Sequence, residues 1–125
     1  MIVGIGVDLL EVGRVERELE RDAPGFLSQL FSAREISEGA GGPFPARHFA
    51  ARFAAKEAVF KALAATDLHT GAWREVEVHS EAGGRREVVL HGRMKTLAEG
   101  LGVRRIALSL SHTRTMAAAG VVLED

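Results

Sequence analysis

The stretch from Pro45 to Ala65 most constrains the fold, because it predicts one long helix that is apolar on two sides. At about 100° per residue, its phenylalanines gather on one face and its alanines on the opposite face. These residues are Phe49, Phe53 and Phe60 on the first face, and Ala51, Ala55, Ala58 and Ala62 on the second. We expect the phenylalanine face to fill a core and the alanine face to allow close approach of another backbone.

A short strand is predicted at the amino terminus. Two sets of residues alternate along residues 2–8: Val3, Ile5 and Val7 on one face, and Gly4, Gly6 and Asp8 on the other. An alternation of period two is typical of a strand. The glycines leave room on their face for either a ligand or a packed helix.

The remaining segments predict a single α+β domain over residues 1–125. Helices are expected over residues 12–20, 24–30 and 93–101, and a further short helix is opened by Ser32 and Glu35 as a capping box. Strands are expected over residues 74–79, 87–90, 104–112 and 116–123. The paired strands have no helix-length crossovers between them, which favours a mostly antiparallel sheet packed on the long central helix.

Composition excludes several classes of function. The formal net charge of −1 argues against a nucleic-acid binder, which usually carries a strong basic excess. With no cysteine, the chain can form neither a disulfide framework nor a thiolate zinc site, which is compatible with a cytoplasmic location. No apolar run approaches the roughly 18 residues that span a bilayer, and Asp8 comes too early for a secretory signal. We expect no membrane association.

Two acids and a lysine lie on these otherwise apolar segments: Asp8 on the first strand, and Glu57 and Lys61 on the long helix. Buried charges cost free energy unless they are paired or bind a metal. Asp8 also fits a helix N-cap, with Glu11 three residues later, and Glu57 and Lys61 also fit a surface i,i+4 pair. The apolar surroundings favour a second interpretation, in which both acids hold Mg²⁺ and Lys61 contacts a phosphate.

Two sets of cations accompany the acids. One set lies on the long helix and the other shares a face of the first helix: Arg47, Arg52 and Lys56, and Arg14, Arg17 and Arg21. The long-helix set forms either a solvated stripe or part of a phosphate site. The first-helix set is either solvated, since Glu18 and Glu20 lie nearby, or docks an acidic protein.

Ser111 and His112 end the first strand of the carboxy-terminal hairpin. His112 shares the parity of Leu108 and Leu110, so a half-buried structural histidine is the first interpretation. The histidines show no zinc-type spacing, and the nucleophile-elbow, dinucleotide and P-loop motifs are all incomplete or missing. A carboxylate–magnesium–phosphate site remains compatible with the sequence.

Three motifs occur in order along nearly the whole chain. They are Gly6-x-Asp8-x-x-Glu11-x-x-Arg14, then Phe53-Ala54-Ala55-Lys56-Glu57-Ala58-x-x-Lys61, then Ser109-Leu110-Ser111-His112-Thr113 with Ala117-Ala118-Ala119. Together they resemble the signature blocks of the small bacterial holo-acyl-carrier-protein synthases, which are 4′-phosphopantetheinyl transferases. The resemblance implies transfer of the 4′-phosphopantetheine arm of coenzyme A to a serine of apo-acyl carrier protein, in fatty acid biosynthesis, with release of adenosine 3′,5′-bisphosphate.

The resemblance also implies a role for each matching residue. Asp8 and Glu57 would hold Mg²⁺, which Mn²⁺ could replace, and Lys61 would contact the phosphate under attack. Glu57, or a water on the metal, would accept the proton of the carrier serine. The remaining assignments are Arg47, Arg52, Lys61, Ser111 and His112 for coenzyme A, and Arg14, Arg17 and Arg21 for docking of the carrier. Relatives of this kind are similar in forming homotrimers with active sites between subunits.

Two other functions stay open at this point: a Mg²⁺-dependent hydrolase of a nucleotide pyrophosphate, and a noncatalytic module that docks carrier proteins. The acids and Lys61 argue against the second, because docking alone has no use for them. The chain departs from the family pattern in two turns, with Ala64-Ala65-Thr66 in place of a Gly-Thr-Gly-like turn and Gly84-Arg85-Arg86 in place of a Gly-x-Pro turn.

Overall fold

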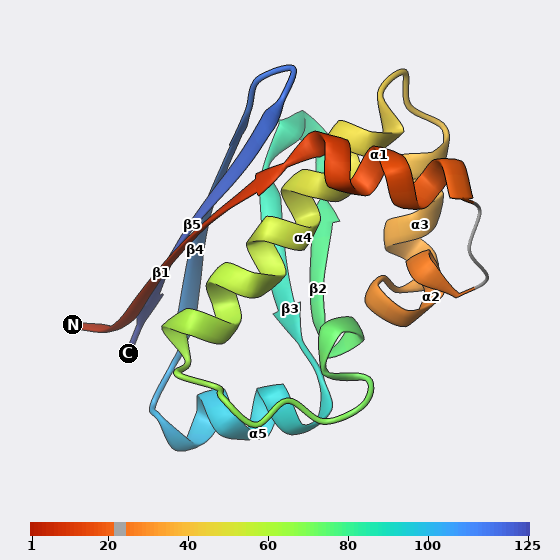
Figure 1. Cartoon of the computed structure of the whole chain (residues 1–125). Coiled ribbons are helices and arrows are strands. Elements are labelled where there is room, and N and C mark those ends of the chain that lie inside the picture. Colours follow the sequence, from red (N-terminus) through yellow and green to blue (C-terminus); the bar gives the residue numbers. More distant parts are fainter. Residues whose placement is uncertain (22–24) are drawn as a thin grey trace.

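A computed structural model describes residues 1–21 and 25–125 (Figure 1). The described elements are, in order, β1 (Ile2–Glu11), α1 (Val12–Arg21), α2 (Phe26–Leu30), α3 (Ala33–Ala40), α4 (Pro45–Ala62), the 3₁₀ helix η1 (Ala72–Glu75), β2 (Val76–Ser80), the 3₁₀ helix η2 (Ala82–Gly84), β3 (Arg86–Leu90), α5 (Gly92–Gly100), β4 (Arg105–His112) and β5 (Met116–Glu124). The start of the predicted helix over 24–30 lies outside the described residues. None of the described helices is long and apolar enough to cross a membrane.

The strands form two antiparallel sheets, which confirms the predicted α+β class. A three-stranded sheet has the order β1-β5-β4, and β2 pairs with β3 in a separate two-stranded sheet. In the larger sheet, Asp8 lies opposite Ala119, which lies opposite Leu110 on β4. The two edge strands are therefore separated by the width of β5.

Helix α4 packs on one face of the three-stranded sheet, as Figure 1 shows. Small residues allow this close approach, because a β-carbon at Gly6 would overlap the carbonyl oxygen of Ala58 and one at Gly4 would overlap that of Ala62. Ala58 is fully buried. Of the two expected uses of the glycine face, the structure therefore shows a packed helix.

The other face of β1 is exposed. Ile5, Val7 and Leu9 are 72%, 65% and 66% exposed. Apolar residues that alternate along a strand usually face a core, so this exposure is unusual. Asp8 is on the opposite, buried face with Leu10. The described helices lie on the α4 side of this sheet in Figure 1, so its outer face is an apolar surface.

Several element boundaries differ from the prediction. The first strand continues three residues past Asp8 and passes directly into α1, so Asp8 is not a helix N-cap. Residues 74 and 75 were predicted to start a strand, but they belong to the 3₁₀ helix η1, and the strand begins at Val76. Helix α4 ends at Ala62, because the Ala65 amide donates to the Phe60 carbonyl and the Ala64 amide to that of Lys61. This pair of hydrogen bonds is a Schellman motif, with Ala64 in the left-handed region at φ 53°.

Lys56 is part of the core, which corrects its predicted place in a cationic stripe. Its Nζ donates to Glu35 Oε1 at 2.8 Å, to the Trp73 carbonyl at 2.9 Å and to the Val76 carbonyl. Glu35 also accepts the Ser32 and Val78 amides, so this ion pair joins α3, α4 and β2. The Ser32 capping box was predicted correctly, but the buried partner of its glutamate was not.

Candidate functional site

Asp8, Glu57 and Lys61 meet where β1 crosses α4. Lys61 Nζ donates to Asp8 Oδ1 at 2.8 Å and to the Val7 carbonyl at 3.2 Å. Lys61 therefore pairs across the helix–strand contact and not with Glu57 in its own helix. The hydrogen bond to Asp8, and the charge of that carboxylate, raise the pKa of Lys61.

Glu57 is half-buried beside this pair. Burial raises the pKa of Glu57, and the neighbouring Asp8 carboxylate raises it further, whereas Lys61 and Arg14 oppose the shift. Two carboxylates that influence each other in this way lie close together, and their mutual repulsion is relieved by a cation. Sequence positions 49 residues apart are thus brought into one cluster.

The donor set fits a magnesium ion better than a metal held by protein alone. The described residues contain no cluster of three or more histidine, cysteine or acidic side chains suited to a metal. Mg²⁺ commonly takes only one or two protein carboxylates and completes its shell with water and substrate phosphates. Asp8 and Glu57 supply that number of hard oxygen donors.

An apolar cavity of about 430 Å³ adjoins Glu57 and Lys61. Its other walls are Phe60, Ala64, Ala65, Thr66, Leu68 and Trp73. Trp73 is fixed between two phenylalanines of α4, because it stacks on Phe53 and meets the edge of Phe60, both at 4.9 Å between ring centres. The cavity suits a long, largely uncharged group attached to a phosphate at the Lys61 end.

A second, cationic cavity of about 380 Å³ gathers four of the residues expected to bind coenzyme A. These are Arg47, Arg52, Ser111 and His112, and they are joined there by His48 and Arg86. Ser111 and His112 are exposed, so the half-buried structural role for His112 is wrong. The concentration of positive charge suits an anion such as a phosphate.

Arg52 forms the floor of this cationic cavity. It is 5% exposed, and its Nη2 donates to Ser80 Oγ at 3.0 Å. Burial, and then the charge of Arg86, lower its pKa to about 10. Its Nε has no hydrogen-bond partner among the described residues, which leaves one buried donor free.

The two cavities lie on different sides of α4. Arg52 and Glu57 are five residues apart, which places their side chains about 140° apart around the helix. Asp8 is on edge strand β1, whereas Ser111 and His112 are on edge strand β4. Within one chain, the acid cluster and the cationic cavity therefore face different ways.

Two of the three arginines of α1 line a third, smaller hollow. Arg14, Arg17 and Arg21 are all exposed, and Arg21 pairs with Glu18 at 3.1 Å. Arg14 and Arg17 line a hollow of about 230 Å³ with the apolar residues Leu10, Val15, Phe26 and Phe53. Glu18 also lines the hollow, so its rim carries two arginines and one acid. An apolar depression with a mainly basic rim suits an acidic amphipathic helix.

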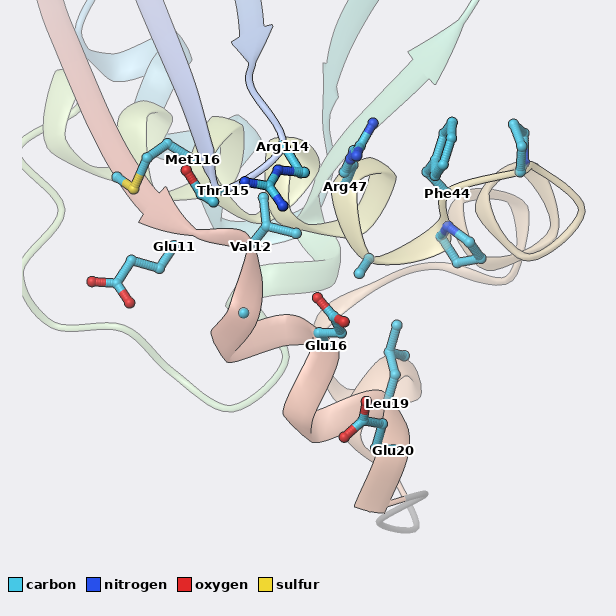
Figure 2. A pocket seen from close by; sticks show the side chains of 14 residues that line it. Glu11, Val12, Glu16, Leu19, Glu20, Phe44, Arg47, Arg114, Thr115 and Met116 are labelled. Carbon is cyan, nitrogen blue, oxygen red and sulfur yellow. The ribbon is translucent and has the colours of Figure 1, made fainter.

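A larger groove of about 850 Å³ lies beyond the cationic cavity. Figure 2 shows Glu11, Glu16 and Glu20 along one side, and Phe44, Arg47 and Arg114 across from them. The Arg47 guanidinium is 4.2 Å from the centre of the Phe44 ring, and both residues line the groove and the cationic cavity. Because acids line this groove, the cationic cavity is the better anion site.

Three residues of the site were missed from the sequence. His48 could have been found, because it lies four residues before Arg52 and so shares its helix face. Arg86 comes from β3 and Trp73 from η1, and neither has a local signal that connects it with α4. Their places depend on how the two sheets pack around the helix.

Comparison with known proteins agrees with this geometry. Residues 4–113 match the family model of the 4′-phosphopantetheinyl transferase superfamily. The chain is 43% identical to a holo-[acyl-carrier-protein] synthase of Koribacter versatilis, over 100% of both chains. It also resembles the crystal structure of that enzyme from Neisseria meningitidis (TM-score 0.89, 29% identity, 100% of both chains). A Bacillus anthracis enzyme in complex with CoA (3′,5′-ADP) is similar too (TM-score 0.77, 30% identity, 98% and 96% covered). The chain belongs to the 4′-phosphopantetheinyl transferase superfamily.

Proposed function

We propose that this protein is a holo-[acyl-carrier-protein] synthase. It transfers the 4′-phosphopantetheine group of coenzyme A to a serine of apo-acyl carrier protein and releases adenosine 3′,5′-bisphosphate. The meeting of Asp8, Glu57 and Lys61 beside an apolar cavity carries this conclusion. Phosphoryl transfer needs positioning and charge neutralisation more than covalent chemistry, and this cluster supplies both. The enzyme serves fatty acid biosynthesis, and we place it in the cytoplasm.

Asp8 and Glu57 hold Mg²⁺ in this proposal, and Mn²⁺ is an expected substitute. When bound, the ion supplies positive charge to the pyrophosphate oxygens of coenzyme A. Lys61 stabilises negative charge on the phosphate under attack. Glu57 is the proposed acceptor for the proton of the carrier serine, because it lines this cavity together with Lys61.

The pantetheine arm lies along the apolar cavity next to Trp73. Its amides and methyl groups suit an apolar wall with few polar groups, and its phosphate end meets Lys61. The nucleotide phosphates lie in the cationic cavity, with Arg47, Arg52, Ser111 and His112 as contacts. The free buried donor on Arg52 supports this assignment.

The carrier protein docks on α1, where Arg14, Arg17 and Arg21 face its acidic surface. The apolar hollow next to Arg14 accepts side chains of the carrier helix. Because Arg14 also acts on the charge of Glu57, docking at this place brings the carrier serine close to the acid cluster. Arg14→Glu is expected to raise the KM for carrier far more than the KM for coenzyme A.

The working form is a homotrimer with active sites between subunits. Two observations support this assembly. The outer face of β1 exposes Ile5, Val7 and Leu9, and such a surface is typical of an interface. The acid cluster and the cationic cavity of one chain face different ways, so a coenzyme A molecule that uses both joins one subunit's cluster to its neighbour's cavity. Sedimentation equilibrium should give three times 13.4 kDa, and Val7→Glu should lower that mass.

The decisive experiment combines purified protein, coenzyme A, Mg²⁺ and apo-carrier, and weighs the carrier by intact mass spectrometry. A gain equal to the phosphopantetheine arm is expected, together with release of the bisphosphate. Transfer should stop with excess chelator and return with Mg²⁺ or Mn²⁺, and transfer that persists in chelator would exclude the metal. Cleavage of coenzyme A at the same rate without carrier would identify a hydrolase instead.

A further inference from the structure

His48 lies on the wall of the cationic cavity. The ring is held between α3 and α4, because a β-carbon at Gly39 would lie 2.5 Å from His48 Cδ2. It also meets the edge of Phe49 at 5.3 Å between ring centres. His48 is thus a fixed part of the cavity.

The surroundings of His48 favour the neutral form of its ring. Its Nε2 is buried and has no hydrogen-bond partner among the described residues. Burial, followed by the charge of Arg52, lowers the pKa of His48 to about 4, with Arg86 acting in the same direction and Glu38 against it. Burial and the neighbouring arginines both disfavour the charged imidazolium form, and a nearby anion would favour it.

The charged and titratable groups around His48 come from four elements. Arg47 and Arg52 are on α4, Glu38 is on α3, Arg86 is on β3, and His112 is on β4. Glu38 is occupied by Arg34 and by the Ser80 amide, so it compensates the arginines only in part. The cavity as a whole is therefore positive, and a bound dianion would reverse the field at His48.

We propose that His48 takes up a proton when a phosphate monoester dianion of the nucleotide binds in this cavity, and thereby adds a positive charge to the wall beside the dianion. The inference rests on the proposed function, because that function supplies the nucleotide. It adds a pH-dependent element to donor binding: below neutral pH, the phosphate's own protonation lowers the affinity for nucleotide, and proton uptake by His48 opposes that loss. One proton taken up corresponds to at most about tenfold in affinity per pH unit.

The test uses adenosine 3′,5′-bisphosphate and the whole chain. Calorimetric titration at pH 6.5 in two buffers of different ionisation heat gives the protons exchanged on binding. The wild type and His48→Gln bind the same ligand. Subtracting the proton uptake of the variant from that of the wild type therefore cancels the contribution of the phosphate's own titration. We expect about half a proton to one proton more to be taken up by the wild type. His91→Gln, which changes an exposed histidine outside the cavity, should behave as wild type.

A second measurement needs no variant. The ring resonances of His48, followed by nuclear magnetic resonance against pH, should give a pKa that rises from about 4 to at least roughly 6.5 when the bisphosphate is bound. Equal proton exchange in the wild type and His48→Gln, or an unchanged His48 pKa, would overturn the inference and leave the transferase assignment intact. If the bisphosphate does not bind at all, both this inference and the proposed function fail.

Discussion

Helix α4 carries two lysines five residues apart, and each forms an ion pair of 2.8 Å with a carboxylate from another element. The side chain of Lys56 is 0% exposed and has two backbone carbonyls besides Glu35. The side chain of Lys61 is 55% exposed and has Asp8 and one carbonyl. The same pairing chemistry thus serves the core in one case and leaves an available ammonium in the other. Burial and the number of partners separate the two roles.

The largest expected effect comes from breaking the buried pair. Lys56→Met keeps most of the side-chain volume but leaves Glu35 charged and unpaired inside the protein. We expect a loss of about 3–5 kcal/mol in the free energy of unfolding, measured by urea denaturation. A loss no greater than that of an ordinary surface substitution would show that Lys56 is not needed to neutralise Glu35.

Breaking the exposed pair should affect catalysis and spare the fold. In the proposed mechanism Lys61→Met removes a cation from the phosphate under attack, so we expect kcat to fall by about 10²–10³-fold. The urea midpoint should stay close to that of the wild type, because an exposed pair contributes little to stability. A variant that unfolds as readily as Lys56→Met would erase the distinction between the two lysines.

A smaller effect is expected at the helix end that follows Lys61. Ala64 occupies the left-handed position of the Schellman motif on α4, whereas Gly102 occupies that position on α5, where the Val103 amide donates to Ala98 and the Gly102 amide to Glu99. Ala64→Gly should stabilise the protein by about 0.5–1 kcal/mol, since relief of strain exceeds the added chain entropy.

Gly102→Ala is the matched control, and it should destabilise the protein by a similar amount in thermal denaturation. If Ala64→Gly lowers stability, then the alanine at the end of α4 is not strained. A fall in transfer with unchanged stability would instead show that the Ala64 methyl contributes to the adjoining cavity.

The smallest expected effect is the loss, at alkaline pH, of the stability that the exposed Lys61–Asp8 pair contributes. The pKa of Lys61 is raised above its unfolded value of 10.5, so its pairing with Asp8 stabilises the fold fully below that pH. This contribution is lost as pH rises through the higher folded-state pKa. The difference in melting temperature between the wild type and Lys61→Met should therefore narrow from pH 9 to pH 12. A constant difference would mean that the ammonium charge is not what Asp8 binds.

The sequence predicted the parts of this molecule that follow from local patterns. The carboxy-terminal hairpin was expected over residues 104–112 and 116–123 and lies within one residue of those bounds. The end of α4 was placed at Ala65 and not Ala62, because nothing in the pattern indicated a Schellman motif with alanine in the left-handed position.

The partners and burial of several side chains depend on tertiary packing, which local sequence patterns do not show. Asp8, Glu57 and Lys61 were expected to meet, and the structure brings them together. Lys56 was misplaced, because the partner that buries it lies on α3, 21 residues away. A packed helix was one of two expected uses of the glycine face of β1, but the exposure of the opposite, apolar face was not predicted.

The opposed directions of the acid cluster and the cationic cavity have a consequence for mixtures of damaged subunits. In the proposed trimer, a subunit with Lys61→Met keeps an intact cationic cavity, and a subunit with Arg52→Met keeps an intact acid cluster. Co-refolding the two inactive proteins would restore roughly a quarter of the sites by complementation, because each interface draws one half from either parent.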